Sequence, residues 1–120
     1  MLKEDSKVIY AMLEAMNATP AVGGLFTAFY PLVGPMDALQ PYCNYSLSQT
    51  SKPTKDTLRA YSVAFVIVAK NYDQVTEAAD LLQQYFEDNH KGFKFSGSDP
   101  SFIDEMDSCI VTTNYNFKIL

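Results

Sequence analysis

The chain has 120 residues, of which 48% are hydrophobic and 19% are charged, and its net charge at neutral pH is −5. This length predicts a single domain over residues 1–120. The acidic balance and the lack of any Lys or Arg run exclude nucleic-acid binding by clustered cations. No apolar run reaches the roughly 18 to 20 residues that span a bilayer. Residues 1–16 carry acids where a signal peptide is apolar, so we expect the chain in the cytoplasm.

The first quarter of the chain predicts a helix and a short strand. The helix is expected from about residue 5 to residue 16, with Asp5 or Ser6 as its cap. Pro20 ends it, because the residue before a proline disfavours helix. A turn at Gly23 and Gly24 then leads into a short strand over residues 25–32, which Gly34 and Pro35 break. The apolar stripe of the helix consists of Val8, Ile9, Met12, Leu13 and Met16.

The central segment predicts two strands joined by a long loop. Residues 42–49 alternate apolar and polar side chains, which is typical of a half-buried strand. Residues 50–57 are polar and contain Lys52 and Lys55, and long loops in compact domains are often functional. The next strand, residues 58–68, is apolar in both registers near its end, which predicts burial on both faces there.

A second helix and two further strands complete the prediction. The helix follows the junction at residues 71–73 and ends at His90, Lys91 and Gly92. Residues 93–95 predict a short strand, residues 96–100 a turn, and residues 106–119 a last strand with one buried face. The helix has one continuous apolar stripe, which consists of Val75, Ala78, Ala79, Leu82, Tyr85 and Phe86.

These elements predict an α+β fold in the order α-β-β-β-α-β-β. Two helices are expected to pack on one face of a mostly antiparallel sheet, which leaves the other face partly bare. The third predicted strand is apolar on that bare face, at Ala64, Val66 and Val68. We therefore expect a neighbouring subunit to cover it.

No residue pattern predicts catalysis. His90, the only imidazole, is expected on the surface at a helix C-terminus, where its charge offsets the helix dipole. Cys43 and Cys109 each lie in a predicted strand and are expected to be reduced and buried. With one His and two Cys, a four-ligand zinc site would need acids at unsuitable spacings. We predict no enzymatic activity, cofactor or metal, and expect function to survive replacement of these three residues one at a time.

Four segments of the chain form a pattern. They are the opening helix KVIYAMLEAMNATPAV, Phe29-Tyr30-Pro31 followed by Gln40-Pro41-Tyr42, Asn71-Tyr72-Asp73-Gln74-Val75 after the third strand, and the closing Tyr115-Asn116-Phe117-Lys118-Ile119. Through these segments the chain resembles the small tail-completion proteins, or tail terminators, of long-tailed bacteriophages and prophages. The likeness covers nearly the whole chain, and it departs from the family pattern at Gln40, where the family has an apolar residue.

This resemblance implies an architectural role. Such proteins form rings, often hexamers, on the end of the tail tube, where they stop polymerisation and join the head connector while DNA later passes through the centre. The implied partners are further copies of the chain, the tail tube protein and the head–tail connector protein, and the implied location is the virion tail. A ring needs head-to-tail contacts, and the expected interface residues are Lys52, Lys55, Ala64, Val66 and Val68.

Two other hypotheses remain open. A small ligand-binding or regulatory α+β domain would dimerise through its sheet and bind its ligand in a pocket of Tyr42, Tyr45 and Tyr61. A ligand-dependent melting shift would support it, and a ring would argue against it. An enzyme with Cys43 or Cys109 as nucleophile would react rapidly with a thiol-selective reagent at neutral pH, unlike a buried thiol.

Overall fold

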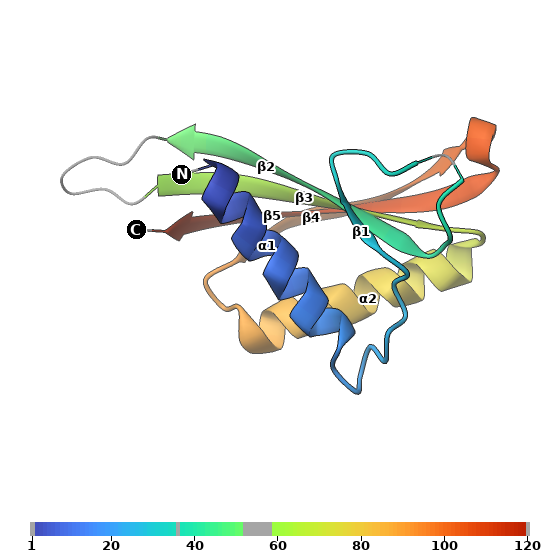
Figure 1. Ribbon diagram of the computed structural model, residues 1–120, viewed down its shortest axis with the longest axis horizontal. Helices are drawn as coiled ribbons and strands as arrows, with labels where there is room; N and C mark the ends of the chain where they lie inside the picture. Colours follow the sequence, from blue (N-terminus) through green and yellow to red (C-terminus); the bar gives the residue numbers. More distant parts are fainter. Residues whose placement is uncertain (1, 36, 52–58, 120) are drawn as a thin grey trace.

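The computed structural model describes residues 2–35, 37–51 and 59–119 (Figure 1). The predicted α+β class and the order α-β-β-β-α-β-β are confirmed. The elements are α1 (Leu2–Asn17), β1 (Phe29–Pro31), β2 (Tyr42–Ser51), β3 (Arg59–Ala69), α2 (Tyr72–Asn89), β4 (Lys94–Ile103), a short 3-10 helix η1 (Asp104–Met106) and β5 (Ser108–Ile119).

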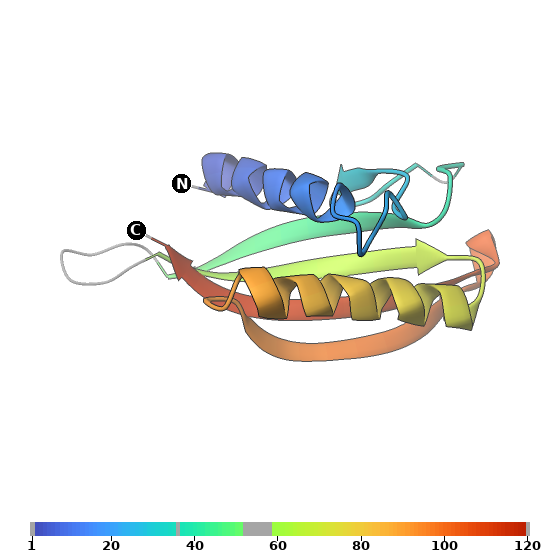
Figure 2. The ribbon, with the colours of Figure 1, turned by 90° about the horizontal axis from the view of Figure 1, so that it is seen from below.

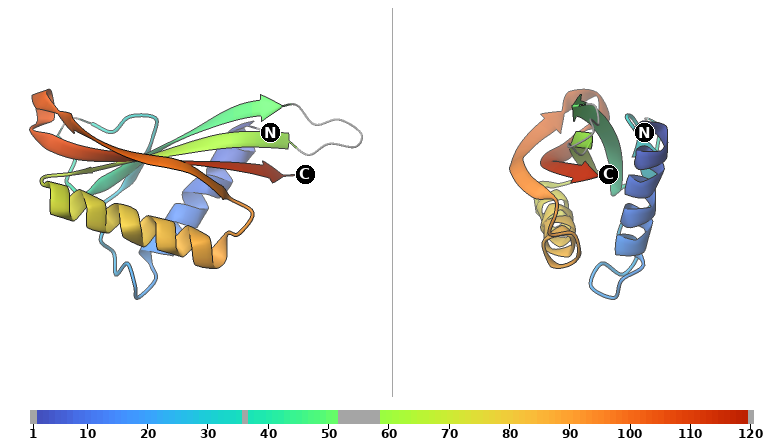
Figure 3. Two further views of the ribbon diagram at one scale, coloured as in Figure 1. Left: turned by 180° about the vertical axis from the view of Figure 1, so that it is seen from behind. Right: turned by 90° about the vertical axis from the view of Figure 1, so that its left-hand side faces the viewer.

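The five strands form one sheet in the order β1-β2-β3-β5-β4. Among the strand pairs of the described residues, β1–β2 is the parallel one and the other three are antiparallel. Both helices lie on one face of the sheet, with α1 against β2 and α2 against β3 and β5. Figure 2 looks onto this helix face, and the end-on view of Figure 3 shows both helices on the same side of the strands. The opposite face is called the open face below.

The core lies between the helices and the helix face of the sheet. Strand residues alternate between the two faces, so β3 turns its odd-numbered apolar side chains toward the helices. The Phe86 ring of α2 lies 5.1 Å from the Phe65 ring and 5.4 Å from the Tyr115 ring, between centroids. Five residues of the predicted α2 stripe are buried, and the sixth, Tyr85, is half-buried. The Asn71 side chain caps this helix by accepting a 2.8 Å hydrogen bond from the Gln74 N–H.

Two predicted boundaries near the start of the chain are wrong. The helix α1 begins at Leu2, so Asp5 lies inside the helix instead of capping it. The first strand covers three residues instead of 25–32. The reason is that the Asn17 side chain forms two hydrogen bonds with the backbone of Phe26. It accepts from the Phe26 N–H at 3.1 Å and donates to the Phe26 carbonyl at 2.9 Å. This contact fixes residue 26 to the end of α1 and away from the sheet.

The predicted turn over residues 96–100 is also wrong, because β4 runs unbroken through this segment for ten residues. Asp99 pairs with Thr112 and Pro100 with Val111, and the register shifts between Phe95 and Gly97. Proline and a bulge are tolerated because β4 is an edge strand. The chain reverses later, through η1 and Asp107, whose φ of 48° is left-handed, so the last strand starts at Ser108 instead of 106.

The loop that contains residues 32–35 and 37–41 covers one end of the open face with these residues. A Cβ on Gly34 would lie 2.7 Å from the Tyr30 ring and 3.0 Å from the Tyr42 ring, so the loop backbone rests directly on the sheet. Gln40 Nε2 also donates to Ser108 Oγ at 2.8 Å. The subunit itself therefore buries this end of the open face.

Candidate functional site

The residues predicted to form an oligomer interface do not form one surface. Val68 is only 1% exposed and lies inside the subunit, so it is not available to a neighbour, contrary to expectation. Ala64 and Val66 are half-buried on the open face. Lys52 and Lys55 lie outside the described residues. Within the predicted loop over residues 50–57, residues 50 and 51 belong to β2.

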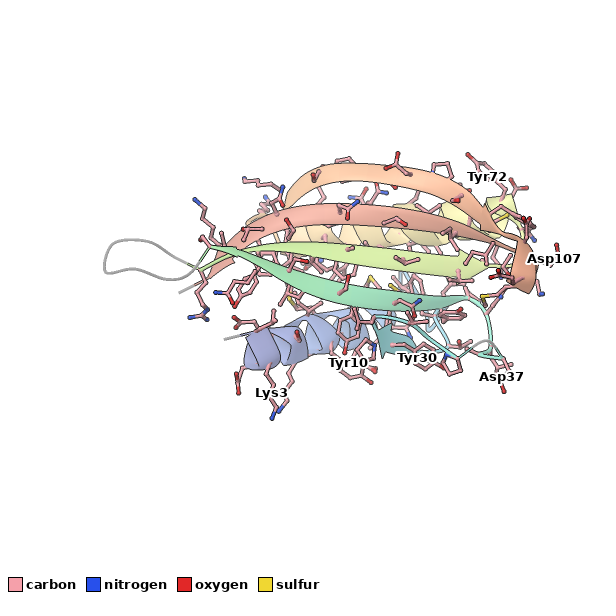
Figure 4. The ribbon with its side chains drawn as sticks, turned by 90° about the horizontal axis from the view of Figure 1, so that it is seen from above. Lys3, Tyr10, Tyr30, Asp37, Tyr72 and Asp107 are labelled. Atoms are coloured by element: carbon pink, nitrogen blue, oxygen red, sulfur yellow. The ribbon has the colours of Figure 1, made fainter. Side chains whose placement is uncertain are left out.

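The remaining open face is mostly polar and uncharged, and Figure 4 looks onto it. Strand pairing sets Ala64 between Ser46 and Asn114 and sets Val66 between Asn44 and Thr112. Ser62 Oγ donates to Asn116 Oδ1 at 2.6 Å in the next row. Two small aliphatic side chains among hydroxyls and amides do not make the apolar patch that the sequence predicted.

A cleft of about 440 Å³ opens at the end of the sheet where β3 begins and β5 ends. Tyr61 and Phe117 line it with buried rings, and Lys94 and Lys118 line it with exposed side chains. The Phe117 ring is stacked on the Phe93 ring at 4.2 Å between centroids. The cleft thus combines an apolar base with positive charge.

A buried carboxylate lies beside this cleft. Asp5 is 6% exposed and accepts hydrogen bonds from the Tyr61 hydroxyl and from Arg59, whose Nε is 3.1 Å from Asp5 Oδ2. Burial alone raises the pKa of Asp5, but the hydrogen bonds from Tyr61 and Arg59 outweigh burial and hold this pKa below its ordinary value. Burial and the bond to Asp5 raise the pKa of Tyr61.

Sequence reasoning missed this cluster, although one signal was present. Asp5 falls on the buried stripe of α1, four residues before Ile9. A charge on an apolar stripe predicts a buried partner. Arg59, the only arginine of the chain, was the available cation.

His90 is not the surface residue that we expected. It caps α2, and its ring lies 5.2 Å from the Phe86 ring and 5.9 Å from the Phe93 ring, between centroids. Its Nε2 is buried without a hydrogen-bond partner, and burial lowers the pKa of the imidazole. A neutral imidazole among aromatic rings contributes packing instead of charge.

The cysteines occupy ordinary strand positions. Cys43 is fully buried, and burial raises the pKa of its thiol, whereas Cys109 is half-buried. Both are free thiols.

Within the described ranges, no three His, Cys, Asp or Glu side chains are grouped as metal ligands. In the same part of the chain, no helix is long and apolar enough to cross a membrane.

The three tyrosines proposed to line a ligand pocket lie on two different faces of the sheet. Strand pairing puts Tyr42 opposite Val68 on the open face, whereas Tyr45 and Tyr61 share the helix face. Tyr45 packs against the Tyr10 ring of α1, with 6.0 Å between centroids. Only Tyr61 lines the cleft, so the predicted tyrosine pocket is wrong.

The two ends of the long axis differ in charge. Figure 4 shows Lys3 toward one end, and Asp37, Tyr72 and Asp107 toward the other. We call the cleft end, with α1's first turns, the basic end. Its exposed lysines are Lys3, Lys7, Lys91, Lys94 and Lys118, and they outnumber the exposed acids of the same end, which are Glu4, Glu87 and Asp88. We call the opposite end the acidic end. Its exposed acids are Asp37, Asp73, Asp104, Glu105 and Asp107, and it also carries the exposed Lys70.

The loop that crosses the open face carries the most exposed large aliphatic side chains of the described residues. Leu32, Val33 and Leu39 are 72%, 79% and 77% exposed, and all three belong to the loop that crosses the open face. Exposed aliphatic side chains that gather on one loop favour a contact surface. Comparison of the chain with protein-family models and with curated protein sequences finds no match.

Proposed function

We propose that the chain is a structural tail-completion protein of a phage or prophage, one subunit of a ring that caps the tail tube and joins it to the head connector. The observation that carries this proposal is the chemical difference between the basic and acidic ends of the molecule. A closed ring is built from unlike patches that meet head to tail, so each subunit must present two different surfaces. The resemblance of the sequence motifs to tail-completion proteins is the reason for proposing a tail-tube ring and not another kind of ring.

The charge of α2 supports the passage of DNA through such a ring. This helix carries no Lys or Arg, and its five carboxylates are all exposed: Asp73, Glu77, Asp80, Glu87 and Asp88. An acidic channel wall repels the phosphate backbone of DNA. Without Lys or Arg to neutralise phosphates and release their counterions, the wall does not bind DNA and so does not stop its passage. We assign the outer face of α2 to the channel side of the ring.

Deletion of the gene from an active phage tests this function. We expect tails of uncontrolled length that fail to join heads, seen by electron microscopy, and rescue by the wild-type gene in trans. Complementation with the Gln84→Ala variant, an exposed substitution on α2, should also rescue fully. Normal tail lengths and normal head joining in the deletion strain would refute the proposal.

The loop between β2 and β3 has an assembly role in this proposal. Its lysines, Lys52 and Lys55, offer positive charge to the tube or the connector. Replacement of residues 52–57 by a two-residue turn should leave the fold intact and reduce tail completion. If the shortened protein completes tails normally, the loop has no such role, and the deletion experiment still decides the function.

The cleft supports a second candidate, a ligand-binding α+β domain. Its volume of about 440 Å³ lies within the size of small-molecule sites, roughly 300 to 1,000 Å³. Apolar rings with Lys94 and Lys118 beside them suit a small anion with an apolar body, such as an aromatic carboxylate. A melting shift with such compounds that Lys118→Ala removes, in a protein that forms dimers only, would favour this function over the ring.

A further inference from the structure

We propose that the cleft at the basic end receives the open-face loop of a second copy, through the described residues 32–35 and 37–39. This inference rests on the proposed ring and names the contact between its subunits. The occupant is a second copy because this chain carries both complementary surfaces.

The loop is built to present its apolar side chains. The Leu32 N–H donates to the Tyr45 carbonyl and the Val33 N–H to the Pro31 carbonyl, each at 2.8 Å. Gly34 lies against the Tyr30 and Tyr42 rings. Since the backbone is already fixed to the sheet, little ordering remains to oppose binding.

The cleft matches the loop in polarity. Tyr61 and Phe117 provide an apolar base for aliphatic side chains, and Ala60 and Gly92 leave room at its sides. Nothing lies within 4 Å of where a Gly92 Cβ would stand. Burial of Leu32, Val33 or Leu39 there removes exposed apolar surface from water.

The charges around the two surfaces are opposite in sign. Lys94 and Lys118 line the cleft, with Lys91 next to Gly92. Asp37 lies within the loop. The acids of η1 lie beside the loop, because the Tyr42 hydroxyl contacts Met106 Sδ at 3.9 Å. Such complementary charge guides encounter and fixes register.

The placement of the two surfaces sets the symmetry. Asp37 of the loop lies toward the end of the molecule opposite Lys3 (Figure 4), whereas the cleft lies where β3 begins, so one copy cannot join its own loop to its own cleft. Contacts between unlike patches are heterologous, and they close into a ring when the rotation between subunits permits.

A charge-swap pair tests the contact. The cleft variant is Lys94→Glu with Lys118→Glu, and the loop variant is Asp37→Lys with Glu105→Lys. Each variant alone puts like charges together and should remain monomeric at low salt, where we expect the wild type to associate. An equimolar mixture restores both opposite-charge contacts and should regain association, measured by sedimentation velocity with unchanged melting temperatures as the folding control.

A cross-link tests the geometry even where association is weak. Val33→Cys with Gly92→Cys, in a Cys109→Ser background, should give a ladder of disulfide-linked oligomers under oxidised glutathione on non-reducing gels. Val33→Cys with Glu77→Cys is the matched control and should give no ladder above background. If the mixture stays monomeric and the test pair cross-links no better than its control, this contact is wrong.

The outcomes separate this contact from the proposed function. Uncontrolled tails in the deletion strain together with failure of both interface tests would keep the ring function and reject the cleft–loop contact. If the purified protein cross-links head to tail but the deletion strain makes normal tails, the contact is kept and the tail function is rejected.

Discussion

A single carboxylate connects α1 to the start of β3. Asp5 accepts from both Arg59 and Tyr61, and the side chains of Asp5 and Arg59 are 8% and 18% exposed. Tyr61 also lines the cleft. The cluster therefore fixes the wall of the cleft as well as the first turns of the helix.

The first prediction concerns the pH dependence of this cluster. The pKa of Asp5 is below its ordinary value of 3.8, so its contribution to stability is present above that value and is lost as pH falls through the lowered pKa. Asp5→Asn should lower the urea midpoint at neutral pH, and its difference from wild type should shrink toward pH ~2. Asp80→Asn, on the exposed face of α2, should change little at either pH. An equal Asp5→Asn deficit at both pH values would contradict an electrostatic role.

Periodicity could predict which residues of α2 are buried, but it could not predict the Asp5 cluster. The stripe of α2 is a local property of one helix, visible at a spacing of three and four residues. The Asp5–Arg59 pair joins segments that only the packing of α1 on β2 and β3 brings together. The packing of His90 is local by contrast, because its ring lies 5.2 Å from the Phe86 ring, four residues earlier, and so extends the stripe of α2.

At the scale of elements, α2 supplies most of the helical contribution to the core. The second prediction is that Leu82→Ala costs roughly 2 to 5 kcal/mol of unfolding free energy, because it leaves a cavity under a helix packed on the sheet. Leu82 is fully buried. Chemical denaturation measures the loss, and Gln84→Ala on the exposed side should stay within about 0.5 kcal/mol of wild type. A loss below about 1 kcal/mol at position 82 would place this residue outside the core.

The third prediction concerns the loop on the open face. Gly34→Ala should destabilise the protein by roughly 1 to 3 kcal/mol, because its Cβ would press into the Tyr30 and Tyr42 rings, and Tyr42 is buried. Gly92→Ala is the matched control, since a Cβ there meets nothing within 4 Å. Equal stability of the two variants would mean that the loop moves freely off the sheet.

Strand β4 shows why turn residues mislead. Its Ser-Gly-Ser-Asp-Pro run has the composition of a turn, yet strand β5 pairs with it through Pro100. An edge strand accepts residues that a central strand rejects, because its outer hydrogen-bonding groups face solvent. Whether a strand lies at the edge depends on the order of all strands in the sheet. Short-range sequence patterns do not reveal this order.

At the scale of the molecule, the separation of charge between the two ends decides how copies meet. The fourth prediction is that self-association weakens as salt rises from about 0.02 M to about 0.5 M, because exposed charges are screened. Sedimentation of the wild type at matched protein concentrations measures this, and the equimolar charge-swap mixture should follow the same trend. Association that strengthens with salt would point to apolar contacts alone.

The position of β3 at the centre of the sheet has a consequence for folding kinetics. It pairs on one side with β2, its hairpin neighbour, and on the other with β5, which reaches it only after α2 and β4. Pairing of distant segments carries a larger loop-closure cost than pairing of neighbours, so the β2–β3 hairpin forms early and the β3–β5 ladder late. Until β5 arrives, one edge of β3 presents a row of unpaired backbone N–H and C=O groups. Newly made chains are therefore most prone to aggregate in the interval before their last strand docks.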